Sequence, residues 1–167
     1  MGQLITKNDA LKSIRIPNVE SSQYGYGAPA VSISHNPNLV DISMPKLKTI
    51  TYPEDSLAIF DCPKFGSLEG FGSLENVNGR VLIRGLKSLK NLHGLEKIRY
   101  TGAGFEVGGF YNNSQMDSLE SLCPFEHFAY SRFDVQFLNC PRLSSLAGLE
   151  TLKKTGFVHL AYLDSLK

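Results

Sequence analysis

The stretch Asn139–Leu152, NCPRLSSLAGLETL, places Leu143, Leu146, Leu149 and Leu152 three residues apart. The same step occurs upstream in GLKSLKNLHGLEKI, residues 85–98, and in DCPKFGSLEGFGSL, residues 61–74. An apolar step that returns along a chain is typical of stacked repeats, in which each unit buries its apolar face against its neighbours. The sequence therefore predicts a solenoid.

Seven coils align when the residue at the start of each apolar step is taken as a reference. The reference residues are Asn8, Asn36, Cys62, Leu86, Asn113, Cys140 and Leu160. Three positions later stand Leu11, Leu39, Phe65, Leu89, Met116, Leu143 and Leu163. A sustained α-helix needs apolar steps that alternate between three and four residues. A constant step of three instead predicts a triangular coil of short extended or 3₁₀ segments.

Short alternating segments precede the reference positions, for example Val31 and Ile33 or Val135 and Phe137. Alternation of β-branched and aromatic residues indicates half-buried strands. We therefore predict a mainly β fold, a right-handed parallel solenoid of about seven short leucine-rich-like coils in one domain, residues 1–167. Asn or Cys at the reference marks the bend after the strand, where an Asn amide can satisfy backbone groups.

The composition is that of a soluble protein with a core: 42% apolar and 20% charged residues, with a net charge of +1. This balance makes a nucleic-acid partner unlikely, and no apolar run has the ~18 residues of a membrane span. The N-terminus lacks the pattern of a secretory signal, and the three cysteines are sparse. Both features predict a cytoplasmic location, in the host cytoplasm if the protein is phage-encoded.

Chemistry-bearing patterns are weak, and we predict a protein that is not an enzyme and has no cofactor or metal. Cys140 and His159 are a thiol and an imidazole predicted in adjacent coils, and a turn histidine is the alternative interpretation. The glycine-rich residues 101–109, TGAGFEVGG, lack the G-x-G-x-x-G order of a phosphate loop. No cysteine or histidine spacing matches a zinc site.

The outward strand positions carry the candidate binding residues. If the third and fifth residues before each reference point inward, the second and fourth point outward. The outward positions in the middle of the stack are apolar, aromatic or arginine, a composition typical of interaction hot spots. The predicted partner-binding residues are Phe60, Leu82, Arg84, Tyr111, Gln136 and Leu138. The alternative is a register shifted by one residue, which would bury these side chains instead.

Two further segments are candidate contact regions. Residues 17–29 form a polar insertion that carries Tyr24 and Tyr26, and it is either a contact loop or a simple connection. The last coil, residues 155–167, stays apolar where solenoids usually become polar. This pattern predicts a covered edge, through a homodimer, another partner, or a terminal turn that folds back.

The units LKSLKNLHGLEKI and PRLSSLAGLETLKK resemble the leucine-rich-repeat-like coils of bacterial and phage proteins, and the related receptor L-domain. The resemblance implies a protein-binding scaffold without catalytic machinery. Together with the small size it suggests an intracellular inhibitor or neutraliser, of the phage anti-defence or toxin-immunity type. Two alternatives remain open, a structural subunit that self-associates through its last coil and a carbohydrate- or surface-binding module.

Overall fold

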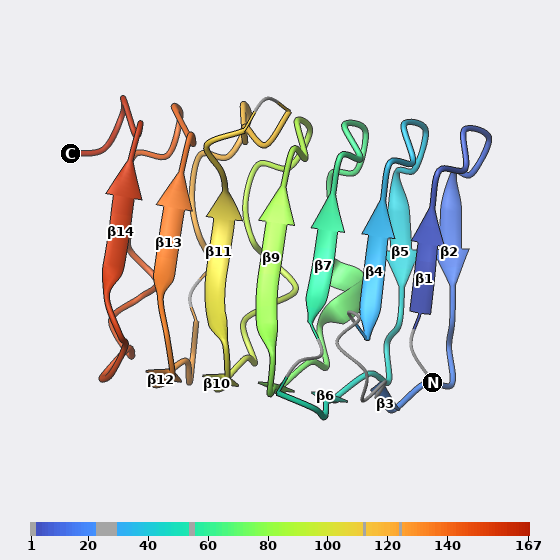
Figure 1. Ribbon diagram of the computed structural model, residues 1–167, viewed down its shortest axis with the longest axis horizontal. Coiled ribbons are helices and arrows are strands. Elements are labelled where there is room, and N and C mark those ends of the chain that lie inside the picture. The colour runs from blue at the N-terminus through green and yellow to red at the C-terminus, as the bar shows by residue number, and fades with distance from the viewer. Residues whose placement is uncertain (1–2, 23–29, 54–55, 112, 124) are drawn as a thin grey trace.

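The computed structural model describes residues 3–22, 30–53, 56–111, 113–123 and 125–167. The chain is a parallel β-solenoid of about six turns, because six turns connect the seven strands of its largest sheet (Figure 1). These strands stand side by side in sequence order, and the two termini lie at opposite ends of the stack. They are β1 (Gln3–Thr6), β4 (Val31–Ser34), β7 (Leu57–Phe60), β9 (Arg80–Arg84), β11 (Gly104–Gly108), β13 (Val135–Leu138) and β14 (Val158–Ala161).

Two smaller sheets form further sides of the coil, and every pairing among the named strands is parallel. A two-stranded sheet pairs β2 (Ser13–Arg15) with β5 (Asp41–Ser43). A five-stranded sheet contains β3 (Ser21–Ser22), β6 (Thr49–Ile50), β8 (Asn76–Val77), β10 (Tyr100–Thr101) and β12 (Tyr130–Ser131). The one helical element of the described residues is the 3₁₀ turn η1 (Glu69–Phe71). These residues contain no helix of the length and apolarity that a membrane crossing requires.

The apolar step of three lines the interior, as predicted. In the coil that follows β9, Leu86, Leu89, Leu92, Leu95 and Ile98 are all fully buried. The inward strand residues are buried with them, for example Val81 and Ile83 of β9. Burial of each such side chain contributes about 1.5–3 kcal/mol. The stacked ladders therefore form one continuous core along the axis of the solenoid.

One residue in each coil bends the chain after the strand of the large sheet. These residues have φ between 52° and 70°, and they are Lys7, His35, Asp61, Gly85, Asn113, Asn139 and Tyr162. The side chain of the residue after the bend often donates to the carbonyl oxygen of the residue before the bend. Asn36 donates in this way to Ser34 at 2.9 Å, and Cys140 to Leu138 at 3.5 Å. The predicted role of Asn at this bend is confirmed.

The register of two coils differs from the sequence prediction. Gly108 and Ala161 both pair with Leu138, so they hold the strand position that had been assigned to Tyr111 and Val158. Tyr111 instead lies in a loop, because four residues separate the end of β11 from the bend at Asn113. In the last coil the bend is Tyr162, so the reference residue is Leu163 rather than Leu160.

The predicted insertion at residues 17–29 is not a plain loop. It contains β3, whose Ser22 is fully buried and whose two residues pair with Thr49 and Ile50. Tyr24 and Tyr26 lie outside the described residues.

Candidate functional site

The outward face of the large sheet is uneven along the stack. Ser32, Ser34 and Ala58 are buried at 4% exposure although they hold outward strand positions. Further along, register places Leu82 of β9 beside Glu106 of β11, and Glu106 beside Gln136 of β13. At the start of the stack the outward residue Leu4 of β1 is 72% exposed, and beyond β4 the outward residues Phe60, Leu82 and Gln136 are half-buried.

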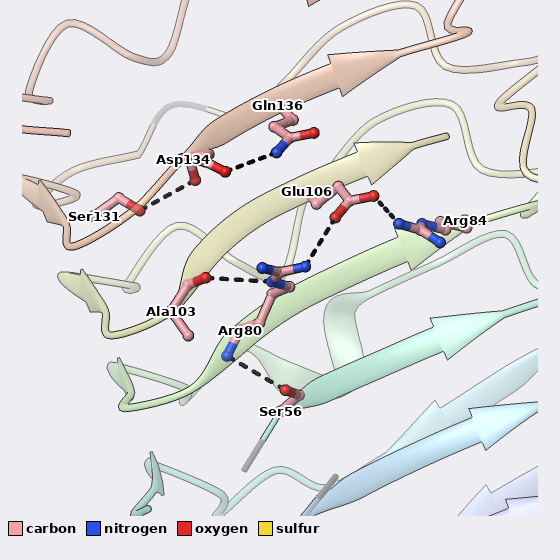
Figure 2. A network of polar contacts seen from close by, with 8 residues as sticks. All are labelled: Ser56, Arg80, Arg84, Ala103, Glu106, Ser131, Asp134 and Gln136. Carbon is pink, nitrogen blue, oxygen red and sulfur yellow. Dashed lines mark hydrogen bonds and ion pairs between the residues drawn. The ribbon is translucent and has the colours of Figure 1, made fainter. Parts of the chain in front are cut away.

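Glu106 lies between two arginines of the neighbouring strand (Figure 2). Its Oε2 accepts a hydrogen bond from Nη1 of Arg80 at 3.4 Å, and its Oε1 accepts one from Nη2 of Arg84. Arg80 also donates through Nε to the carbonyl oxygen of Ala103 at 3.3 Å. Because Arg80 and Arg84 are four residues apart on one strand, both side chains leave the same face of the sheet.

The positive charges of this group are more exposed to solvent than its negative charge. The side chain of Glu106 is 6% exposed, whereas those of Arg80 and Arg84 are 44% and 26% exposed. A buried carboxylate requires charged hydrogen-bond partners, and the two guanidinium groups supply them. Glu106 therefore neutralises part of the arginine charge from beneath while the arginines face solvent.

A cavity of about 240 Å³ opens beside Arg84, and we call it the sheet-face cavity. It is lined by Phe60, Asp61, Leu82, Arg84, Tyr111 and Ser114. Four of these residues were predicted as partner-binding from the sequence: Phe60, Leu82, Arg84 and Tyr111. The structure brings these four together, although Tyr111 reaches the cavity from the loop after β11 and is 75% exposed.

A second cavity of about 350 Å³ lies next to the first, at the bends that follow the strands. The two cavities share Asp61, and the second is lined also by His35, Pro63, Gly85, Lys87 and Asn113. Nε2 of His35 lies 3.2 Å from Oδ2 of Asp61, and the His35 ring packs edge-on to Phe60 with 5.4 Å between centroids. Asp61 thus directs one carboxylate oxygen toward the second cavity.

The other two described candidates lie elsewhere on the face. Gln136 is half-buried on β13, where its Nε2 donates to Oδ2 of Asp134 at 3.0 Å, and it does not line the sheet-face cavity. Leu138 was expected to face solvent, but it is buried at 1% exposure. Rings from the coils on both sides of β13 meet near its end, since Phe110 lies 5.5 Å from His159 and 6.1 Å from Tyr162.

Those rings form an exposed aromatic cluster that the sequence prediction did not identify. It contains Phe110, Phe157, His159 and Tyr162, and its phenylalanine and tyrosine side chains are 53–63% exposed. His159 had been placed at a bend, but it pairs with Gln136 in the middle of β14. The cluster was not predicted because the bend of the last coil was assigned to the wrong residue. Only the correct register places these side chains next to one another.

Glu106 was also missed, although a signal was present. The alternation of Phe105 and Val107 marks an inward pair like that of Val81 and Ile83. Aligning these pairs places Glu106 opposite Leu82, between the two arginines. The residue four positions before Asn113 is instead Gly109, so the spacing from that reference residue does not identify Glu106.

The cysteines lie in the interior and are not activated thiols. Burial raises the pKa of Cys140 and of Cys123 to about 12, and it also raises the pKa of Cys62. Cys140 is fully buried, whereas His159 belongs to the exposed aromatic cluster, so the two do not form a nucleophile and base. Within the described ranges, no group of three or more His, Cys, Asp and Glu side chains is placed to hold a metal ion.

Comparison with known proteins found no matching protein family, no similar curated protein and no similar solved structure.

Proposed function

We propose that the protein is a non-enzymatic scaffold that docks a protein partner on the outward face of its large sheet. The observation that carries this proposal is the sheet-face cavity, in which Phe60, Leu82, Arg84 and Tyr111 converge. Aromatic and arginine side chains around a central hollow are the usual anchors of protein interfaces. The parallel sheet fixes three of these residues on strands, so that docking costs little ordering of the scaffold.

The narrower role rests on size and on the leucine-rich-repeat-like sequence of the coils. A small rigid face that covers part of another protein suits an intracellular inhibitor or neutraliser, of the phage anti-defence or toxin-immunity type. Such a protein acts by steric blockade, since it needs to occupy a surface and not to transform a substrate.

The test is a site-specific photocrosslink. A photoreactive phenylalanine analogue replaces Tyr111, and a control variant carries it in place of Tyr52, which is 45% exposed after β6. In bacterial lysate we expect one protein adduct at position 111, lost when Phe60→Asp is added, and no such adduct at position 52. Identical adducts at both positions, or none at position 111, would contradict docking on the sheet face.

A second candidate function is assembly through the last coil, and one specific observation favours it. Val158 and Leu160 of β14 are 49% and 39% exposed, and Phe157 beside them is 53% exposed. Contiguous exposed apolar side chains of this kind usually mark a contact. Light scattering on the wild type and on Leu160→Asp tests this function: a dimer lost in the variant supports self-association, and a monomer in both contradicts it.

A further inference from the structure

We propose that the sheet-face cavity recognises an acidic side chain of the partner that is flanked by an apolar or aromatic one. This inference rests on the proposed docking function and specifies the chemistry of the docked segment. It follows from the donors that Arg84 leaves free, from the exposed charge around the cavity and from its apolar walls.

Arg84 is held so that only part of its guanidinium remains available. Nη2 donates to Glu106. Nε is buried without a hydrogen-bond partner and packs close to Gly109, since a Cβ added to that glycine would lie 3.3 Å from Nε. Among the described residues no group accepts a hydrogen bond from Nη1. This nitrogen carries two donors, and a carboxylate is the acceptor with which arginine forms its strongest hydrogen bonds.

The exposed charge near the cavity favours an anion. The Glu106 carboxylate is shielded, whereas both arginines expose their cations; Lys87 of the adjoining cavity is also exposed, with its Nζ 3.9 Å from Oδ2 of Asp117. Among the described residues that line the sheet-face cavity, Asp61 is the one acid, and its carboxylate lies near His35 and Gly85 of the adjoining cavity. Oδ2 faces His35, and Oδ1 lies 3.0 Å from the position a Cβ on Gly85 would take. Arg84 is therefore the cation of this cavity with which an incoming carboxylate would pair.

The apolar and aromatic walls of the cavity determine which residue can stand next to the acidic residue of the partner. Phe60 and Leu82 are half-buried strand residues, and Tyr111 stands exposed at the rim. A volume of about 240 Å³ accommodates a side chain rather than a folded element. An apolar neighbour of the acidic residue would cover Leu82 and stack against the aromatic rings, and it would exclude water from the new ion pair.

The experiment compares two blocked pentapeptides, acetyl-Gly-Leu-Glu-Phe-Gly-amide and the same peptide with Gln in place of Glu. Binding is followed by NMR through the Leu82 methyl groups and the Arg84 Nε–H. We expect the Gln peptide to bind about tenfold more weakly, the difference between a charged and a neutral hydrogen bond. Arg84→Gln should make the two peptides equal, whereas the control Lys48→Gln, which removes an exposed cation beside β6, should preserve the difference.

Equal affinities for the wild type overturn the proposal, and so does a difference that persists in Arg84→Gln. Absence of shifts for both peptides at millimolar concentration overturns it as well. These failures are distinguishable from failure of the docking function, because the photocrosslink at position 111 reports any protein partner whatever its charge. A single adduct there, with equal peptide affinities, leaves docking supported and removes only the acidic preference.

Discussion

The fourth and fifth coils share one interior but differ in what they present outside. In the fourth coil β9 runs directly into its bend, since Gly85 follows Arg84. In the fifth coil β11 ends at Gly108, and four residues pass before the bend at Asn113. The buried ladder is the same in both coils. The difference shows that the ladder determines the stacking of the coils, while the residues inserted between strand and bend add Tyr111 to the proposed binding surface.

The first prediction tests how the fifth coil leaves the sheet. Gly108 has φ of 76°, and an added Cβ would lie 1.7 Å from the carbonyl oxygen of Leu138. Gly108→Ala combines an unfavourable backbone conformation with a clash against a fixed strand, so we expect a loss of about 3 kcal/mol in the free energy of unfolding. Urea denaturation measures this change. At Gly66 an added Cβ would meet its nearest atom at 3.4 Å, so Gly66→Ala should change stability little, and equal losses in both variants would contradict the assignment.

The second prediction concerns the charges that join the two coils. The double variant Arg80→Gln/Arg84→Gln leaves the buried Glu106 carboxylate without its two cationic partners. We expect a loss of about 2 kcal/mol, below the usual cost of breaking a buried ion pair because both arginines are partly exposed. Adding Glu106→Gln should recover part of this loss, since a neutral amide is less costly to bury. Thermal unfolding of the double and triple variants gives the comparison, and a triple variant less stable than the double would contradict this account.

The third prediction separates the inserted loop from the ladder. Phe110 and Tyr111 are 54% and 75% exposed, so Phe110→Ala/Tyr111→Ala should cost about 0.5–1 kcal/mol at most. Leu89→Ala in the fourth coil removes a fully buried side chain and should cost about 2–5 kcal/mol. Equilibrium unfolding in urea measures both. A loop variant as unstable as the ladder variant would show that the loop supports the fold.

The smallest effect is a pH dependence in the fourth coil. Burial alone would raise the pKa of Glu96, but hydrogen bonds from backbone N–H groups and from His93 outweigh it and lower the pKa below its ordinary value of 4.5. A lowered folded pKa contributes stability that is present above pH 4.5 and lost as pH falls through the folded value. Glu96→Gln should therefore narrow the stability difference between pH 6 and pH 3, as thermal melts would show. An unchanged difference would contradict the assignment.

Much of the fold follows from the sequence because the interior is periodic. The leucine step of Leu86 to Leu95 and the strand pair Val81 and Ile83 predict the ladder and the sheet without reference to tertiary contacts. Counting backward from a bend fails where the spacing changes, as it does before Asn113. The count then misplaces both Glu106 and Tyr111.

The candidate site was predicted in part for a related reason. Phe60, Leu82 and Arg84 belong to regular coils, so alternation alone orients them. The burial of Glu106 depends on arginines 22 and 26 residues away in the preceding coil. The aromatic cluster likewise joins Phe110 to His159 and Tyr162, which lie two coils further along the chain. Local patterns carry no information on such contacts until the register is known.

Docking on the sheet face is tested most directly with a variant in which the fifth coil, like the fourth, passes from its strand straight into its bend. Deleting residues 109–112 places Asn113 immediately after Gly108 and removes Tyr111 from the rim, and none of the deleted residues belongs to the buried ladder. A photoreactive phenylalanine analogue at position 60 then reports the partner in both the parent and the deletion variant. We predict a folded deletion variant that loses the adduct seen in the parent. The same adduct at equal yield in a folded deletion variant would contradict the account.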